Sequence, residues 1–194
     1  MEEHTGSDAP SSGRSDTRRA ADLALLLQQE CRQLLELYKE RESFLCQHVP
    51  EGGRLVIPAV CEEVITSADQ VGHVRSALRG CLELLECLIL QEVEQMGQEL
   101  EGEYETVRKT VKDRLGHLLH STGALLENGE GVCPPSPDYQ CNQGQDEVEG
   151  PGSFANKMWT YRVLLELIHW TDSAAQALHL LHSEREAEQQ QQEL

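Results

Sequence analysis

The sequence has few aromatic residues, few basic residues and no long apolar run. Aromatic residues make up 4% of its 194 residues, and β-branched residues are few in the long apolar-periodic stretches, which favours helices over a β-sandwich or barrel. Only 16 Lys and Arg stand against 34 Asp and Glu, so the formal net charge is −18. That balance argues against binding to nucleic acid or to an anionic membrane surface. No apolar run approaches the roughly 20 residues of a membrane span, so we expect no membrane insertion.

The sequence also shows no secretory-signal pattern and no closely spaced cysteine pair. Its first residues, MEEHTGSDAPSSGRSDTRR, are polar and include no apolar segment, so we expect the chain to start in the cytosol. The seven cysteines form no C-x-x-C motif, and an odd, scattered set fits mostly reduced thiols. Cys81 and Cys87 point to different faces of one expected helix and should not pair. Cys133 and Cys141 share one loop and could pair after export.

Proline is absent from residues 11–49, 59–133 and 152–194, and these tracts can therefore hold long helices. Apolar residues at three- and four-residue steps predict a first helix over about 16–46, a second that opens after Ser67 and is interrupted at Gly97, a third over about 104–125, and a fourth whose polar tail frays. The expected core stripes are Ala20, Leu23, Leu27, Cys31, Leu34, Tyr38 and Leu45; Val71, Val74, Leu78, Cys81, Leu85 and Leu88; Tyr104, Val107, Val111, Leu115, Leu118 and Leu125; and Trp159, Val163, Leu167, Trp170, Ala174 and Leu181.

The lengths of the connections predict the topology of these helices. The link around 97–103 is too short to return along a helix of about 40 Å, so the second and third helices are expected to be antiparallel. The segments 47–66 and 129–153 are long enough to run the full length of the bundle. We therefore expect an all-α, up-up-down-down four-helix bundle of the long-chain cytokine type with two long crossover loops. It would occupy residues 16–183, after a disordered segment 1–15 and before a polar tail 184–194.

Two residues at the start of the last helix are the candidate binding residues. On a helical wheel Phe154 falls almost opposite the core stripe, and Lys157 lies about 60° from it on the same side. An aromatic side chain beside a cation, both away from the core, suits a hot spot of a protein interface. In the alternative interpretation Phe154 caps the end of the bundle under the 129–153 segment. The periodicity does not separate the two interpretations.

The segment GSFANKMWTYRVLLELIHWT, residues 152–171, resembles the fourth helix of the ciliary neurotrophic factor and leukaemia inhibitory factor group of long-chain helical cytokines. The matching features are Phe154-x-x-Lys157 followed by Trp159, Val163-Leu164, Glu166-Leu167 and Trp170-Thr171. LLELYKE around Tyr38 is similar to the first helix of that group, and EGEYETV at 101–107 is similar to the entry of its third helix.

This resemblance implies a cytokine that brings cell-surface receptors together and so triggers kinase–STAT signalling. It implies that Phe154 and Lys157 contact the leukaemia inhibitory factor receptor, while other faces bind the shared signal-transducing receptor and an α-receptor. It also implies cytoplasmic storage, unconventional release and action outside the cell, and the absence of an N-x-S/T sequon suits that route. His169 and Asp172 occupy the outward positions near Trp170 where a basic residue is expected for an α-receptor. We expect a monomer or a weak dimer.

Two other functions are compatible with parts of the sequence. A second apolar stripe on the last helix, Phe154, Met158, Tyr161, Leu165 and Ile168, would suit an intracellular helical adaptor, unless the crossover around Leu55–Val60 covers it. Glu166-x-x-His169 is one half of a di-iron motif, but the helices contain no second copy. His117/His120 and His179/His182 have spacings that suit zinc but no evident third ligand. No nucleotide-binding loop or catalytic motif occurs, so we expect a protein that is not an enzyme and needs no cofactor or metal.

Overall fold

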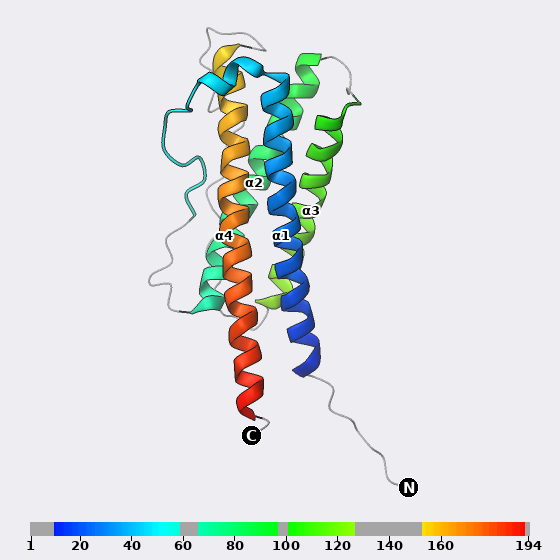
Figure 1. The fold of residues 1–194 in the computed structure, drawn as a ribbon, viewed down its shortest axis with the longest axis vertical. Coiled ribbons are helices and arrows are strands. Elements are labelled where there is room, and N and C mark those ends of the chain that lie inside the picture. Colours follow the sequence, from blue (N-terminus) through cyan, green and yellow to red (C-terminus); the bar gives the residue numbers. More distant parts are fainter. Residues whose placement is uncertain (1–9, 59–65, 97–100, 127–152, 193–194) are drawn as a thin grey trace.

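The computed structural model describes residues 10–58, 66–96, 101–126 and 153–192, and within these ranges all regular structure is helical. Four long helices lie side by side in an elongated bundle (Figure 1). They are α1 (Pro10–Arg41), α2 (Ser67–Met96), α3 (Glu103–Leu125) and α4 (Phe154–Gln192), and a short 3-10 helix, η1 (Ser43–Gln47), follows α1.

Each helix that packs against a neighbour of the bundle runs antiparallel to it. The pairs in contact are α1 with α3 and α4, and α2 with α3 and α4. In each pair, residues near the start of one helix contact residues towards the end of the other. The contacts are Tyr38–Lys157 and Thr17–Arg185 between α1 and α4, Arg41–Glu105 and Glu30–Arg114 between α1 and α3, Ser67–Glu184 and Cys81–Glu166 between α2 and α4, and Glu92–Tyr104 and Arg75–Leu119 between α2 and α3.

The core consists of the apolar stripes that the periodicity predicts. All six predicted residues of α2 are buried, and the other three stripes are buried with four exceptions. Leu23, Val107, Leu125 and Trp159 are only partly buried, although they pack against the core. Burial of a Leu or Val side chain is worth about 1.5–3 kcal/mol, so these stripes supply the main force that holds the helices together.

The first helix differs from its predicted bounds at both ends. It begins at Pro10, within the segment 1–15 that was expected to be disordered, and residues 1–9 lie outside the described residues. Proline suits a first helical position, because its missing N–H would have no helical partner there. At the other end α1 stops at Arg41 rather than continuing to residue 46, and the chain tightens into η1. This change of helix type lets Leu45 turn into the core, where it is fully buried.

The polar tail also differs from the expectation of fraying, because α4 continues to Gln192. Side chains at the start of the tail contact two other helices: Glu184 accepts a hydrogen bond from Ser67 of α2, and Arg185 donates one to Thr17 of α1. These contacts anchor the helix beyond its last core residue, Leu181.

The segment after η1 packs along the outer side of α4. Val56 is fully buried and Leu55 is partly buried against the core, and the Arg162 guanidinium donates a hydrogen bond to the Gly53 carbonyl at 3.0 Å. The segment therefore lies against α4 beside the second apolar stripe that the sequence predicts. Within that stripe Tyr161 is buried, and Met158, Leu165 and Ile168 are partly buried.

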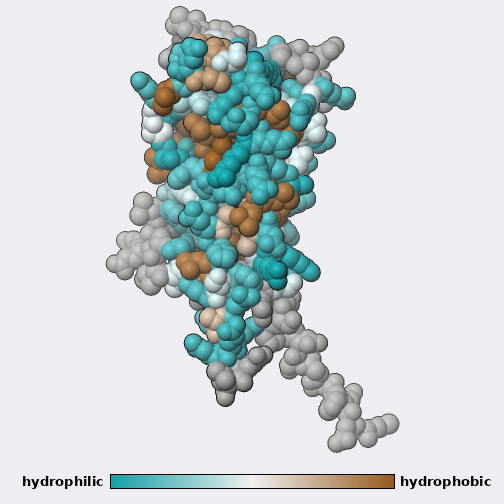
Figure 2. Space-filling view, viewed as in Figure 1, coloured by the Kyte–Doolittle hydropathy of each residue, from teal (hydrophilic) through white to brown (hydrophobic). Residues whose placement is uncertain are grey.

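The face of the bundle drawn in Figure 2 is mostly polar. Figure 2 shows a largely hydrophilic face with separate, small apolar groups. None of the described helices combines the length and the apolarity that a membrane span requires.

Candidate functional site

The candidate site lies where the end of α1 and η1 meet the first turn of α4. Ser153 caps α4, because its Oγ accepts a hydrogen bond from the Asn156 N–H at 3.2 Å. The cap places Phe154 at the first helical position, so its side chain projects from the end of the bundle. On the facing side buried Leu45 anchors η1, and the residues on either side of it, Phe44 and Cys46, are exposed.

Three rings form what we call the aromatic end cluster: Phe44, His48 and Phe154. The Phe154 ring centroid lies 6.0 Å from that of Phe44 and 5.2 Å from that of His48. A hydrogen bond of 3.0 Å between His48 Nδ1 and the Phe44 carbonyl ties the two η1-side rings together. Phe154 is 50% exposed and Phe44 is 38% exposed. The cluster is therefore an accessible aromatic surface and not part of the core.

Lys157, one turn into α4, lies beside this cluster. Its ammonium forms an ion pair with the Glu42 carboxylate at 2.7 Å and lies 5.2 Å from the centroid of the Phe44 ring. Its backbone carbonyl accepts a hydrogen bond from the Tyr38 hydroxyl at 3.2 Å. The side chain of Lys157 is 31% exposed, while that of Glu42 is 14% exposed. The lysine thus already has an anionic partner within its own chain.

The structure brings both predicted residues, Phe154 and Lys157, to one surface. Sequence reasoning missed the other half of that surface, which consists of Glu42, Phe44 and His48. One signal was available, since the chain has only two phenylalanines and both lie in the cluster. The alternative interpretation, in which the 129–153 segment covers Phe154, concerns residues 129–152, which lie outside the described residues.

A compact polar network adjoins the cluster and supports it. The Tyr38 and Tyr104 rings lie 5.7 Å apart, and the Arg41 and Arg108 guanidinium groups lie 5.3 and 5.6 Å from the Tyr104 ring. Glu92 accepts hydrogen bonds from Tyr104 and Arg108. Burial raises the pKa of both tyrosines and of Glu92, and the nearby Arg108 charge opposes the shift at Glu92. Buried charges that are paired in this way hold α1, α2 and α3 in one arrangement at this end of the bundle.

The two residues of the Glu166-x-x-His169 motif contact Trp170 and Arg54. The Glu166 carboxylate is buried, accepts a hydrogen bond from the Trp170 indole at 3.0 Å and pairs with Arg54 at 3.6 Å. His169 lies edge-on to the Trp170 ring at 4.8 Å, and burial lowers its pKa, with the Arg54 charge adding to the shift. Across the described ranges no three His, Cys, Asp or Glu side chains are grouped so that they could hold a metal ion.

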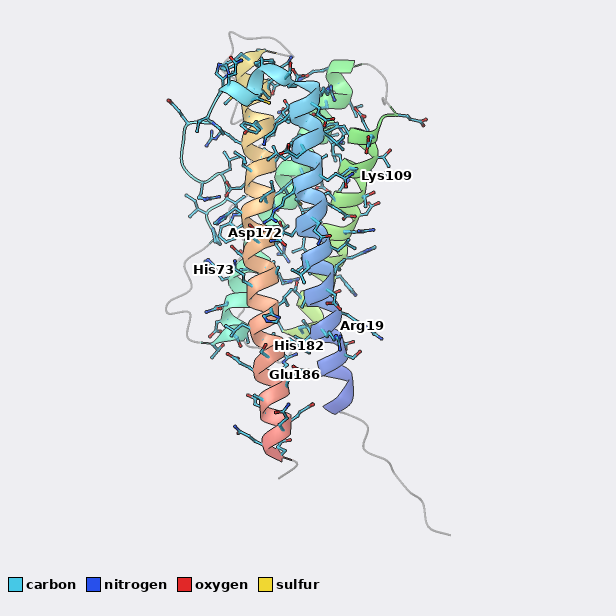
Figure 3. All side chains as sticks on the ribbon, viewed as in Figure 1. Arg19, His73, Lys109, Asp172, His182 and Glu186 are labelled. Atoms are coloured by element: carbon cyan, nitrogen blue, oxygen red, sulfur yellow. The ribbon has the colours of Figure 1, made fainter. Side chains whose placement is uncertain are left out.

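The other residues singled out in the sequence are distributed along the bundle. His117, His120 and His179 are exposed, and His182 lies 3.5 Å from Glu186 one turn along α4 (Figure 3). Asp172, halfway along α4, faces α1 and pairs with Arg32 at 3.1 Å (Figure 3). Asp172 therefore takes part in a contact between two helices, whereas the sequence predicts an outward position for it.

The cysteines differ in part from the expectation of reduced thiols. Cys31, Cys46 and Cys81 are free, and only Cys46 among them is exposed. Cys87 is disulfide-bonded, and its partner is none of these three. Cys133 and Cys141 lie outside the described residues.

No family model matches this chain, and no curated protein matches it significantly. The chemistry of the site itself is that of a contact surface, because apolar rings, one cation and one carboxylate are the groups that it presents. Such a group can bury its rings in a partner's pocket and exchange polar contacts at the rim.

Proposed function

We propose that this protein is a helical cytokine of the ciliary neurotrophic factor type, which acts outside the cell by bringing receptor chains together. The observation that carries the proposal is the half-exposed Phe154 beside Lys157 and Phe44 at one end of a helical bundle. The two α4 residues are those of the F-x-x-K element, which in that group contacts the leukaemia inhibitory factor receptor.

The directions of the helices support a long-chain cytokine topology. Because α1 and α2 are each antiparallel to both α3 and α4, α1 and α2 run in the same direction and α3 and α4 run in the other. These directions support the proposed up-up-down-down topology, which requires long connections after α1 and after α3. The chain has such connections, since 25 residues (42–66) separate α1 from α2 and 28 residues (126–153) separate α3 from α4.

The chemistry of the aromatic end cluster supports a protein partner. A phenylalanine that is half exposed in the free protein gains burial when it enters a pocket, and aromatic anchors of this kind dominate interface energies. The large negative charge makes a nucleic-acid partner a poor match. In the proposed complex the cluster binds the leukaemia inhibitory factor receptor, and other faces bind the shared signal-transducing receptor and an α-receptor.

One further observation bears on the adaptor alternative. The crossover segment lies against α4 at Arg162 and Glu166, and within the second apolar stripe Tyr161 is buried and Met158, Leu165 and Ile168 are partly buried. The part of the stripe between residues 158 and 168 is therefore less available to a cytosolic partner than the exposed Phe154.

The test is the double variant Phe154→Ala/Lys157→Ala, with receptor-dependent STAT phosphorylation as the readout. We expect signalling to be lost, while helicity and melting temperature stay close to the wild-type values because both side chains lie at the surface. The matched control is Arg79→Ala/Leu90→Ala, which removes an exposed cation and an exposed apolar side chain from α2. Normal signalling by the site variant would contradict the proposal, and its unfolding would show that Phe154 is a structural residue.

A further inference from the structure

We propose that Lys157 is a positioning residue: its ammonium holds Glu42 and Phe44 against the first turn of α4 and so assembles the aromatic end cluster. This inference rests on the proposed function and assigns a role within the same site. In it the partner's pocket recognises the rings of the cluster, and a carboxylate of the partner is not required to pair with Lys157.

The contacts of the Lys157 ammonium carry this inference. The ammonium lies 2.7 Å from the Glu42 carboxylate and 5.2 Å from the Phe44 centroid, and both groups belong to the segment that follows α1. One cation therefore spans the boundary between the two halves of the cluster. Phe154, on the same turn of α4 as Lys157, contacts the Phe44 ring directly. The lysine and the phenylalanine thus act on the same neighbour.

The charges at the site also support a positioning role for Lys157. The Glu42 carboxylate compensates the Lys157 charge, so a partner would meet a neutral pair rather than a free cation. A second carboxylate that approached the ammonium would also be repelled by Glu42, which lies at the same point. The rings, by contrast, have no such competitor: Phe154 and Phe44 are more exposed than either charged side chain.

The position of the Phe44 ring depends on contacts from outside η1. Leu45 anchors the backbone of η1 in the core, and the His48 N–H donates a hydrogen bond to the Leu45 carbonyl at 2.9 Å. These contacts hold the main chain, and the exposed Phe44 side chain is held by its contacts with the Phe154 and His48 rings and by the Lys157 ammonium. The cation above its face favours one position, and such contacts order a side chain before binding.

A charge swap separates positioning from direct pairing. The variants are Lys157→Glu, Glu42→Lys and the double variant Glu42→Lys/Lys157→Glu, each measured for binding to the leukaemia inhibitory factor receptor ectodomain. We expect each single variant to bind about tenfold more weakly. Lys157→Glu loses the ion pair and the cation–π contact, Glu42→Lys loses the ion pair, and both variants gain a like-charge repulsion. We expect the double variant to recover to within about threefold of wild type. A double variant as weak as Lys157→Glu alone would overturn the inference, because a lysine that pairs with a partner carboxylate cannot be replaced from position 42.

A second readout does not depend on the receptor. Because the chain has only two phenylalanines, incorporation of 4-fluorophenylalanine gives one fluorine resonance from Phe44 and one from Phe154. We expect both resonances to shift in Lys157→Glu and to return towards their wild-type positions in the charge-swapped double variant. Spectra that are unchanged in the single variants would overturn the inference. If wild-type protein binds no receptor ectodomain, the proposed function fails, and the fluorine spectra alone then decide whether Lys157 positions the cluster.

Discussion

Glu166→Ala tests whether one buried carboxylate holds the crossover segment against α4. Glu166 is 5% exposed, and its two oxygens accept hydrogen bonds from the Trp170 indole at 3.0 Å and from the Leu55 backbone N–H at 3.3 Å. Arg54 adds an ion pair at 3.6 Å from a half-exposed position. Removal of the carboxylate leaves the indole and the Leu55 N–H without these acceptors.

The expected loss of stability follows from these contacts. A hydrogen bond to a charged group contributes about 1.5–3 kcal/mol, and the exposed ion pair contributes less than about 1 kcal/mol. Removal of a buried carboxylate also removes its desolvation penalty, which offsets part of the loss. We therefore expect the free energy of unfolding to fall by about 3 kcal/mol. For a protein of this size that corresponds to a melting temperature lower by roughly 6–12 °C.

Two measurements check this expectation. Thermal unfolding followed by circular dichroism gives the change in stability, and limited trypsin digestion reports on cleavage after Arg54 in the crossover segment. Glu166→Gln retains an oxygen acceptor and should lose only about 1 kcal/mol. Glu188→Ala, an exposed glutamate on the same helix, is the matched control and should stay within about 0.5 kcal/mol of wild type. If Glu166→Ala melts with wild type and resists trypsin equally well, the carboxylate does not hold the crossover.

Two further predictions concern the thiols and the core. Exposed Cys46 should react with Ellman's reagent in the folded protein and buried Cys31 should not, because burial raises the pKa of Cys31 to about 12. The folded-state pKa of this thiol lies above the unfolded value of about 8.5, so its stabilising contribution is complete below pH 8.5 and is lost as the pH rises towards 12. The free energy of unfolding of Cys31→Ala should therefore depend less on alkaline pH than that of wild type. The same pH dependence in both proteins would contradict this prediction. Leu85→Ala, in the core of α2, should lower the free energy of unfolding by about 2–5 kcal/mol in chemical denaturation, whereas exposed Leu90→Ala on the same helix should change it by less than about 0.5 kcal/mol.

The long helices and their buried faces could be predicted because each rests on a local signal. The six residues of the stripe predicted for α2 lie on one helical face, and all six are buried. The start of α2 also rests on a local signal: the Asp69 N–H donates a hydrogen bond to the Thr66 hydroxyl, and the Thr66 N–H donates one to the Asp69 carboxylate, as in a capping box. This cap lies one residue before Ser67, after which the sequence predicts the helix to open. Gly102 likewise precedes α3 in an extended conformation.

The end of α1 could not be predicted, because no proline or glycine lies between Arg41 and Val49. The helix ends there without a local stop signal: the chain continues as η1, and Leu45 within η1 is fully buried. The periodicity therefore predicts a helix that continues to residue 46, and it gives no sign that Phe44 belongs to the aromatic end cluster. The partners of Glu166 could not be predicted for a similar reason. In the sequence Glu166 is half of a metal motif, whereas in the structure its two oxygens accept hydrogen bonds from Trp170 and from Leu55 of the crossover segment.

The helix directions place the start of α1 and the end of α4 at one end of the bundle, and the aromatic end cluster lies at the other (Figure 1). The 39-residue α4 separates these ends by roughly 57 Å at 1.5 Å per residue. A biotin or a dye attached at the start of α1 or at the end of α4 would therefore stand well away from the cluster. Two copies joined near these helix ends by a flexible linker would leave both clusters accessible, so such a tandem protein would raise the effective concentration of the cluster for any partner that binds it.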